Sequence, residues 1–126
     1  MARAFWTLLA GATLLGHPGL AGDRALADRL AAEIAGHIEP GWSVRASWRE
    51  ATLVAFVTPP YAESWAFINE QARQREMWAA ICATIGEGTW AALPEGGGIA
   101  VEPVFGGKSE TRLRQACAPG GLADAS

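Results

Sequence analysis

The chain has 126 residues, of which 50% are hydrophobic and 18% are charged, and its formal net charge is −3. This length supports one domain, and the balanced composition excludes a disordered, collagen-like or multi-span membrane protein. The mild negative charge, without a basic tail, also argues against binding of nucleic acid.

Residues 1–21 are typical of a secretory signal peptide. One basic residue, Arg3, precedes the short apolar run 5–15, and small residues at Gly19 and Ala21 precede the expected cleavage site. The apolar run is shorter than the roughly 20 residues that cross a bilayer. We therefore expect cleavage after Ala21 rather than a retained anchor, and a periplasmic or secreted protein with no membrane span after cleavage.

The next segment predicts a helix followed by two strands. Leucine and isoleucine recur every fourth residue after Asp23, a good N-cap, until Pro40-Gly41 forbids continuation. The period then falls to two over 42–49, which predicts a strand with one side packed inward. The run 52–57 is apolar on both sides, which indicates a strand covered on both faces.

A second helix and a second pair of strands follow. Helical spacing extends over 61–85, and a short turn of helix is expected at 89–93. A strand is predicted at 99–105, with Pro103 favouring an edge or a bulge, and a polar strand at 109–115 returns from the glycine turn.

These elements follow the order α-β-β-α-β-β. We expect an α+β fold in which the helices pack on one face of a four-stranded antiparallel sheet. The expected organisation is a signal peptide at 1–21, a single domain at 22–118 and a disordered tail at 119–126, which begins with Pro119-Gly120-Gly121.

Two cysteines, Cys82 and Cys117, are 35 positions apart and both follow the signal. In an oxidising compartment an isolated pair predicts a disulfide. The alternative makes one of them a nucleophile with His37, but this would leave two reactive thiols in an oxidising environment. His37 falls near the end of the first helix, where the helix dipole favours a cation.

No motif predicts a catalytic residue, a metal or a cofactor. Gly107-Lys108-Ser109 resembles the end of a phosphate-binding loop, but the required earlier glycine is Glu102. The single histidine after the signal and the two distant cysteines lack the close spacing of zinc ligands.

The period-two pattern also predicts a basic surface on the open face of the sheet. It would hold four arginines, which are Arg45, Arg49, Arg112 and Arg114. Their guanidinium groups could bind carboxylates or phosphates. The alternative is a solvated face on which Glu102 and Glu110 neutralise them.

Trp90 is a second candidate for a binding surface. Five tryptophans follow the signal, and large rings at strand and helix periods fill cores more often than ligand grooves. Trp90 lies between glycines and a proline, so we expect it to be the most exposed of them.

From the first cysteine onward the layout resembles small exported proteins of the quorum-sensing-regulated virulence factor type and, more distantly, secretion pilotins. The residues that carry the resemblance are Cys82, the run Gly96–Val101, Gly106-Gly107 and Cys117. Pilotins of this sort are lipid-anchored, and this chain lacks a cysteine near the cleavage site. The resemblance implies a disulfide-linked α+β module whose role is binding, and it supplies no catalytic residue.

The expected function is therefore a small, exported, non-enzymatic interaction module whose partner is another exported or envelope protein. The alternative is a small exported hydrolase or an enzyme inhibitor with a site near Trp90 and the glycine loops. A concave site that collects His37, Glu87, Glu95 or Ser109 would favour the enzyme, whereas a flat apolar or basic patch would favour a partner.

Overall fold

The structure is a computed structural model that describes residues 23–60, 71–105 and 107–123. The predicted signal peptide and the first ten residues of the predicted second helix lie outside the described residues. The elements are α2 (Arg24–Ala35), β2 (Ser43–Arg49), β3 (Thr52–Thr58), α4 (Gln71–Ala83), α5 (Glu87–Ala91), β4 (Gly98–Phe105), β5 (Lys108–Ser109), a 3-10 turn (Thr111–Leu113), β6 (Gln115–Ala118) and β7 (Gly121–Leu122).

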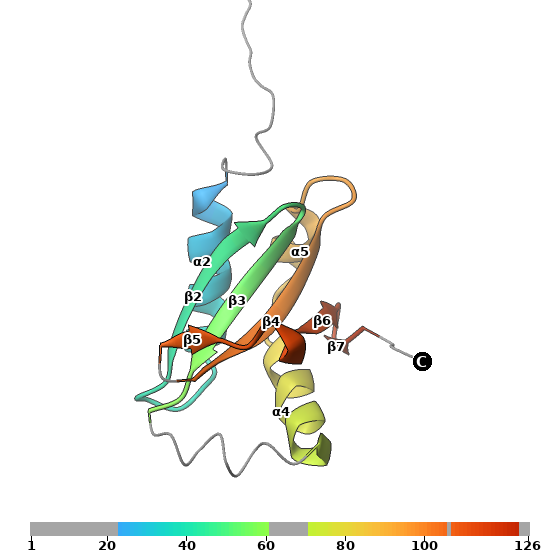
Figure 1. The fold of residues 1–126 in the computed structure, drawn as a ribbon. Coiled ribbons are helices and arrows are strands. Elements are labelled where there is room, and N and C mark those ends of the chain that lie inside the picture. The colour runs from blue at the N-terminus through green and yellow to red at the C-terminus, as the bar shows by residue number, and fades with distance from the viewer. Residues whose placement is uncertain (1–22, 61–70, 106, 124–126) are drawn as a thin grey trace, which may run out of the picture.

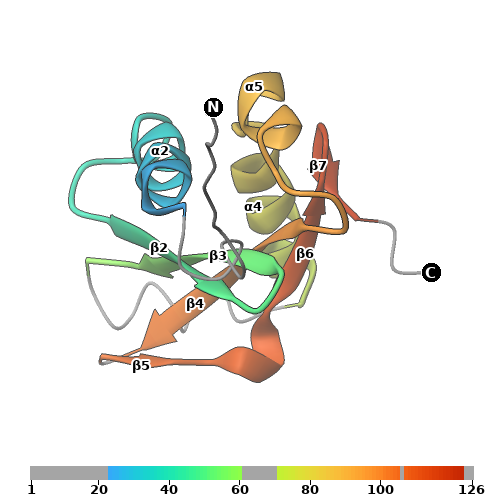
Figure 2. The same cartoon turned by 90° about the horizontal axis from the view of Figure 1, so that it is seen from above.

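The described chain forms one mixed sheet with helices on one face (Figures 1 and 2). The strand order is β2-β3-β4-β6-β7, and β5 pairs with the far end of β4. In Figure 2, α2, α4 and α5 lie on one side of the sheet and β5 on the other. The predicted α+β class and the single helical face are confirmed.

The predicted four-stranded antiparallel sheet is wrong, because the sheet has six strands and β3 and β4 run parallel. The helices α4 and α5 carry the chain back along the sheet, so β4 starts beside the start of β3. Parallel neighbours need such a crossover, and a two-residue period carries no information about strand direction.

The predicted polar strand at 109–115 is also wrong, because the chain there is broken into β5, the 3-10 turn and β6. β6 pairs with β4 at Ala100 and Val101, and β5 pairs with it at Val104 and Phe105. The break falls opposite Pro103, which has no N–H to donate to the ladder. Gly121–Leu122, which fall within the segment expected to be a disordered tail, form β7 against β6.

The first helix begins where the sequence predicts but ends at Ala35, before the predicted limit at Pro40, so His37 lies beyond its last turn. The Asp23 carboxylate accepts a hydrogen bond from the backbone N–H of Leu26 at 3.0 Å, so Asp23 caps α2 as expected. Leu30 and Ile34 are fully buried against the sheet. The indole N–H of Trp48 on β2 donates to the Asp23 carbonyl at 3.1 Å, which joins the start of α2 to the first strand.

Replacement of Asp23 by alanine should lower the free energy of unfolding by about 1 kcal/mol, because the first turn of α2 loses its side-chain acceptor. Asp28→Ala on the exposed side of the same helix is the matched control and should change stability by less than about 0.5 kcal/mol. Urea denaturation followed by circular dichroism measures both. Equal stability of the two variants would contradict the capping role.

The main core lies between the helices and the sheet. β3 is buried on both faces, as its apolar run predicts, with residues 53–57 all at or below 2% exposure. Trp78 of α4 is fully buried in this core. The predicted disulfide is confirmed, since Cys82 of α4 and Cys117 of β6 are bonded, with their Cα atoms 5.4 Å apart. The disulfide thus ties β6 covalently to the helical layer.

The short helix α5 confirms the expected turn of helix, two residues earlier than predicted. It is held by α2, because the Glu33 carboxylate accepts from the Thr89 hydroxyl at 2.8 Å and from the Gly86 N–H at 3.3 Å. A Cβ at residue 86 would lie 2.9 Å from the other Glu33 oxygen, so a larger residue there would displace the end of the Glu33 side chain.

Among the described residues, no helix combines the length and the hydrophobicity needed to cross a bilayer.

Candidate functional site

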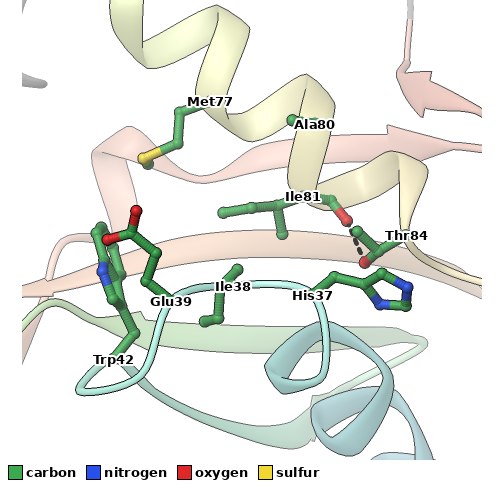
Figure 3. Close-up of a pocket in the computed structure, with 8 residues that line it drawn as sticks. All are labelled: His37, Ile38, Glu39, Trp42, Met77, Ala80, Ile81 and Thr84. Carbon is green, nitrogen blue, oxygen red and sulfur yellow. Dashed lines mark hydrogen bonds between the residues drawn. The ribbon is translucent and has the colours of Figure 1, made fainter.

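An apolar groove opens between α4 and the loop that follows α2, with a volume of about 300 Å³. Figure 3 shows the loop residues facing the α4 residues across it. The groove is lined by His37, Ile38, Glu39, Trp42, Met77, Ala80, Ile81 and Thr84. This volume is at the lower end of the range for small-molecule sites.

Two polar groups of the groove are engaged within the chain. The Thr84 hydroxyl donates to the Ile81 carbonyl at 2.7 Å, and Nδ1 of His37 lies 2.9 Å from the Glu33 carbonyl (Figure 3 draws the first bond). The lining includes His37 but not Glu87, Glu95 or Ser109. The groove therefore lacks a serine or cysteine nucleophile beside its histidine, and its chemistry suits an apolar group.

The second feature is a pair of arginines on the face of the sheet opposite the helices. The Cζ atoms of Arg45 and Arg49 lie 4.8 Å and 5.0 Å from the ring centre of Phe56, within cation–π range. We call these three residues the arginine platform. Both arginines are exposed, whereas Phe56 is only 2% exposed because the side chains above it cover the ring.

Strand register brings the platform together. Arg45 is the direct cross-strand partner of Phe56, and Arg49 lies four residues further along β2 on the same face. The Arg49 guanidinium leans back along the strand, donating to the Ser47 hydroxyl at 2.7 Å and to the Trp48 carbonyl at 3.2 Å. Two positive charges thereby share one aromatic ring.

The platform keeps its positive charge. Within residues 23–60, 71–105 and 107–123, no ion pair joins Arg45 or Arg49 to a carboxylate. Arg45 has no hydrogen-bond acceptor within the same ranges, and it is exposed. Because two like charges held close together repel, a bound anion with two or more acceptor oxygens would offset that repulsion.

The other two predicted arginines have different surroundings. Nε of Arg114 is 2.7 Å from the carboxylate of Glu102, which is 1% exposed and also accepts from the Thr111 hydroxyl at 3.3 Å. Arg112 is 82% exposed and lies 3.6 Å from Glu110. Glu102 therefore pairs with Arg114 and Glu110 lies beside Arg112, and neither carboxylate pairs with Arg45 or Arg49.

Trp90 lies in the other layer of the molecule. It belongs to α5, is half-buried and packs against the core between helices and sheet. Its indole nitrogen is buried without a hydrogen-bond partner among the described residues. In Figure 2, α5 is on the helix side of the sheet, so Trp90 and the arginine platform do not form one surface.

Sequence reasoning placed Arg45 and Arg49 on the open face but missed Phe56. The run 52–57 is apolar at every position, so no local pattern distinguishes the ring that faces the arginines from the side chains that face the helices. Only the pairing of Arg45 with Phe56 identifies it.

The described residues contain no group of three or more histidine, cysteine, aspartate or glutamate side chains that could hold a metal ion. Comparison of the chain with models of protein families, with curated proteins and with solved structures gave no match.

Proposed function

We propose that this protein is a small exported interaction module that holds carboxylate groups of another exported or envelope protein on its arginine platform. One observation carries the proposal: two exposed guanidinium groups converge on Phe56 and have no carboxylate partner among the described residues. The platform performs no bond-breaking step in this function.

Guanidinium geometry supports carboxylates as the ligand. Each guanidinium presents N–H donors in a planar fork that matches the two oxygens of a carboxylate. The contact with Phe56 holds both groups above one ring, so less side-chain freedom is lost when a ligand binds. Hydrogen bonds to charged groups contribute about 1.5–3 kcal/mol each, less at an exposed site because of salt screening.

The covalent structure supports the exported compartment. A buried disulfide joins α4 to β6, and disulfides persist in the periplasm and outside the cell, where thiols are not kept reduced. The signal pattern at 1–21 belongs to the same proposal, together with the resemblance to exported disulfide-linked proteins.

The direct test is binding of a tetraglutamate peptide to the oxidised protein, measured by NMR titration at low ionic strength. We expect shifts at the Arg45 and Arg49 side-chain N–H groups and no comparable response to tetralysine. The double variant Arg45→Ala/Arg49→Ala should bind tetraglutamate at least about tenfold more weakly, because it loses both charged donors.

The control removes the same charge elsewhere. Arg24 on α2 and Lys108 on β5 are exposed, so Arg24→Ala/Lys108→Ala matches the change in net charge and should leave binding nearly unchanged. Equal weakening in both double variants would show that only net charge attracts the peptide, and the platform would then have to be abandoned as the binding site.

A further inference from the structure

The outer edge of β2 is open to pairing. In the described part of the chain β2 is the terminal strand of the sheet and pairs only with β3. Every second residue of such an edge directs its backbone N–H and C=O away from the sheet, where another strand can pair with them. The two-residue turn at 50–51 pairs Arg49 with Thr52 across the hairpin, so the backbone groups of Trp48 face outward, and the Trp48 carbonyl already accepts from the Arg49 side chain. By the two-residue period, Val44 and Ala46 face outward as well.

The two faces of this edge differ in chemistry. On the open face the edge carries Arg45 and Arg49, both exposed. On the helix face it carries Val44, Ala46 and Trp48, which pack against the core but are only half-buried. A strand added beside β2 would place every second side chain next to the two arginines and the others next to the apolar residues. Cross-strand neighbours of opposite charge stabilise a sheet, so acidic side chains are favoured beside the arginines.

A second copy of the chain does not fit this edge. Pairing of β2 with β2 would bring the arginines of both copies onto one face, and like charges on neighbouring strands destabilise a sheet. Charged side chains on an edge strand are also a common way to prevent self-pairing. The charge of the edge therefore favours an acidic strand from a different protein.

We propose that β2 accepts a β-strand from a partner protein, with carboxylates on the face of the sheet that carries Arg45 and Arg49 and apolar side chains at the alternate positions. This inference rests on the proposed function and names how the partner binds. Main-chain hydrogen bonds to β2 supply affinity in this arrangement, and the arginine platform supplies the preference for acidic residues.

The test uses seven-residue peptides that alternate valine with a charged residue, added to the oxidised, ¹⁵N-labelled protein. We expect the glutamate–valine peptide to slow hydrogen exchange of the Val44, Ala46 and Trp48 amides. It should bind at least about tenfold tighter than the lysine–valine peptide, because its charges complement the arginines. A peptide of the same composition with its glutamates grouped at one end should protect these amides less.

A proline at the edge separates strand pairing from charge. Ala46→Pro removes one outward N–H, a change that edge strands tolerate, whereas Ala46→Val keeps it. We expect Ala46→Pro to bind the glutamate–valine peptide about tenfold more weakly than Ala46→Val, while both bind tetraglutamate as the unchanged protein does. Near-ultraviolet circular dichroism checks that Ala46→Pro is folded. If it is not, the hydrogen-exchange measurement on the unchanged protein still tests strand pairing.

Three results would overturn the inference. Binding of the alternating peptide without protection of the β2 amides, with tetraglutamate binding intact, would reject strand addition and leave the platform standing. Failure of both peptides to bind would reject the platform as well. Protection of the β2 amides that rises with protein concentration, without peptide, would identify a second copy as the occupant.

Discussion

Replacement of Cys82 and Cys117 by alanine should lower the free energy of unfolding by about 2–5 kcal/mol, measured by urea denaturation. The disulfide closes a loop of 35 residues and joins α4 to β6. The entropy lost by the unfolded chain when such a loop is closed is worth about 3–4 kcal/mol. Because a typical domain is stable by about 5–15 kcal/mol, the variant would lose a large part of its stability.

Reduction of the unchanged protein provides the control for this prediction. Both cysteines are buried, at 0% and 8% exposure. The reduced protein therefore keeps two thiols in the core, where the alanine variant has two methyl groups. We expect the reduced protein and the alanine variant to unfold at similar urea concentrations, well below that of the oxidised protein. Coincident unfolding of the oxidised and reduced proteins would contradict a stabilising crosslink.

Replacement of Arg114 by alanine should destabilise the fold by about 2–3 kcal/mol, because it leaves the buried Glu102 carboxylate without its cation. Glu102 is 1% exposed, and among the described residues it would retain only the Thr111 hydroxyl, at 3.3 Å, as a hydrogen-bond donor. Arg112→Ala is the matched control on the same turn. Since Arg112 is 82% exposed, its loss should cost less than about 0.5 kcal/mol.

A double variant distinguishes the unpaired charge from lost packing. Glu102→Gln removes the buried charge at nearly constant volume, so Arg114→Ala/Glu102→Gln should be more stable than Arg114→Ala alone by about 1 kcal/mol. Thermal unfolding of the four proteins completes the cycle. If the double variant is no more stable than Arg114→Ala, the loss of stability comes from the missing arginine side chain rather than from the unpaired Glu102 carboxylate.

In the proposed function, the arginine platform and the Glu102–Arg114 pair have different tasks on the open face. Glu102 is the register partner of Phe56, so the buried carboxylate and the ring of the platform lie on adjacent strands. Arg114 neutralises the carboxylate, which leaves the charges of Arg45 and Arg49 available for a ligand. We therefore expect the Arg114 variants to report on stability and the Arg45 and Arg49 variants to report on binding.

The local elements in the first half of the described chain could be predicted from sequence alone. Asp23 and the apolar residues at every fourth position after it predict α2, and the two-residue period predicts β2. The uninterrupted apolar run predicts that β3 is covered on both sides. Each of these properties depends on neighbours a few residues apart, which is the range over which caps and periodicity act. The disulfide followed from the presence of only two cysteines in a chain expected to be exported.

The tertiary structure alone decided how these elements meet. The parallel pairing of β3 with β4 depends on the path of α4 and α5, and the break between β5 and β6 depends on which strand faces Pro103. The same holds for the four arginines, which have the same charge but different partners. Register places Arg45 opposite Phe56, while the 3-10 turn brings Arg114 to Glu102. Strand order and register join residues that are distant along the chain, so no local pattern of charge or hydrophobicity specifies them.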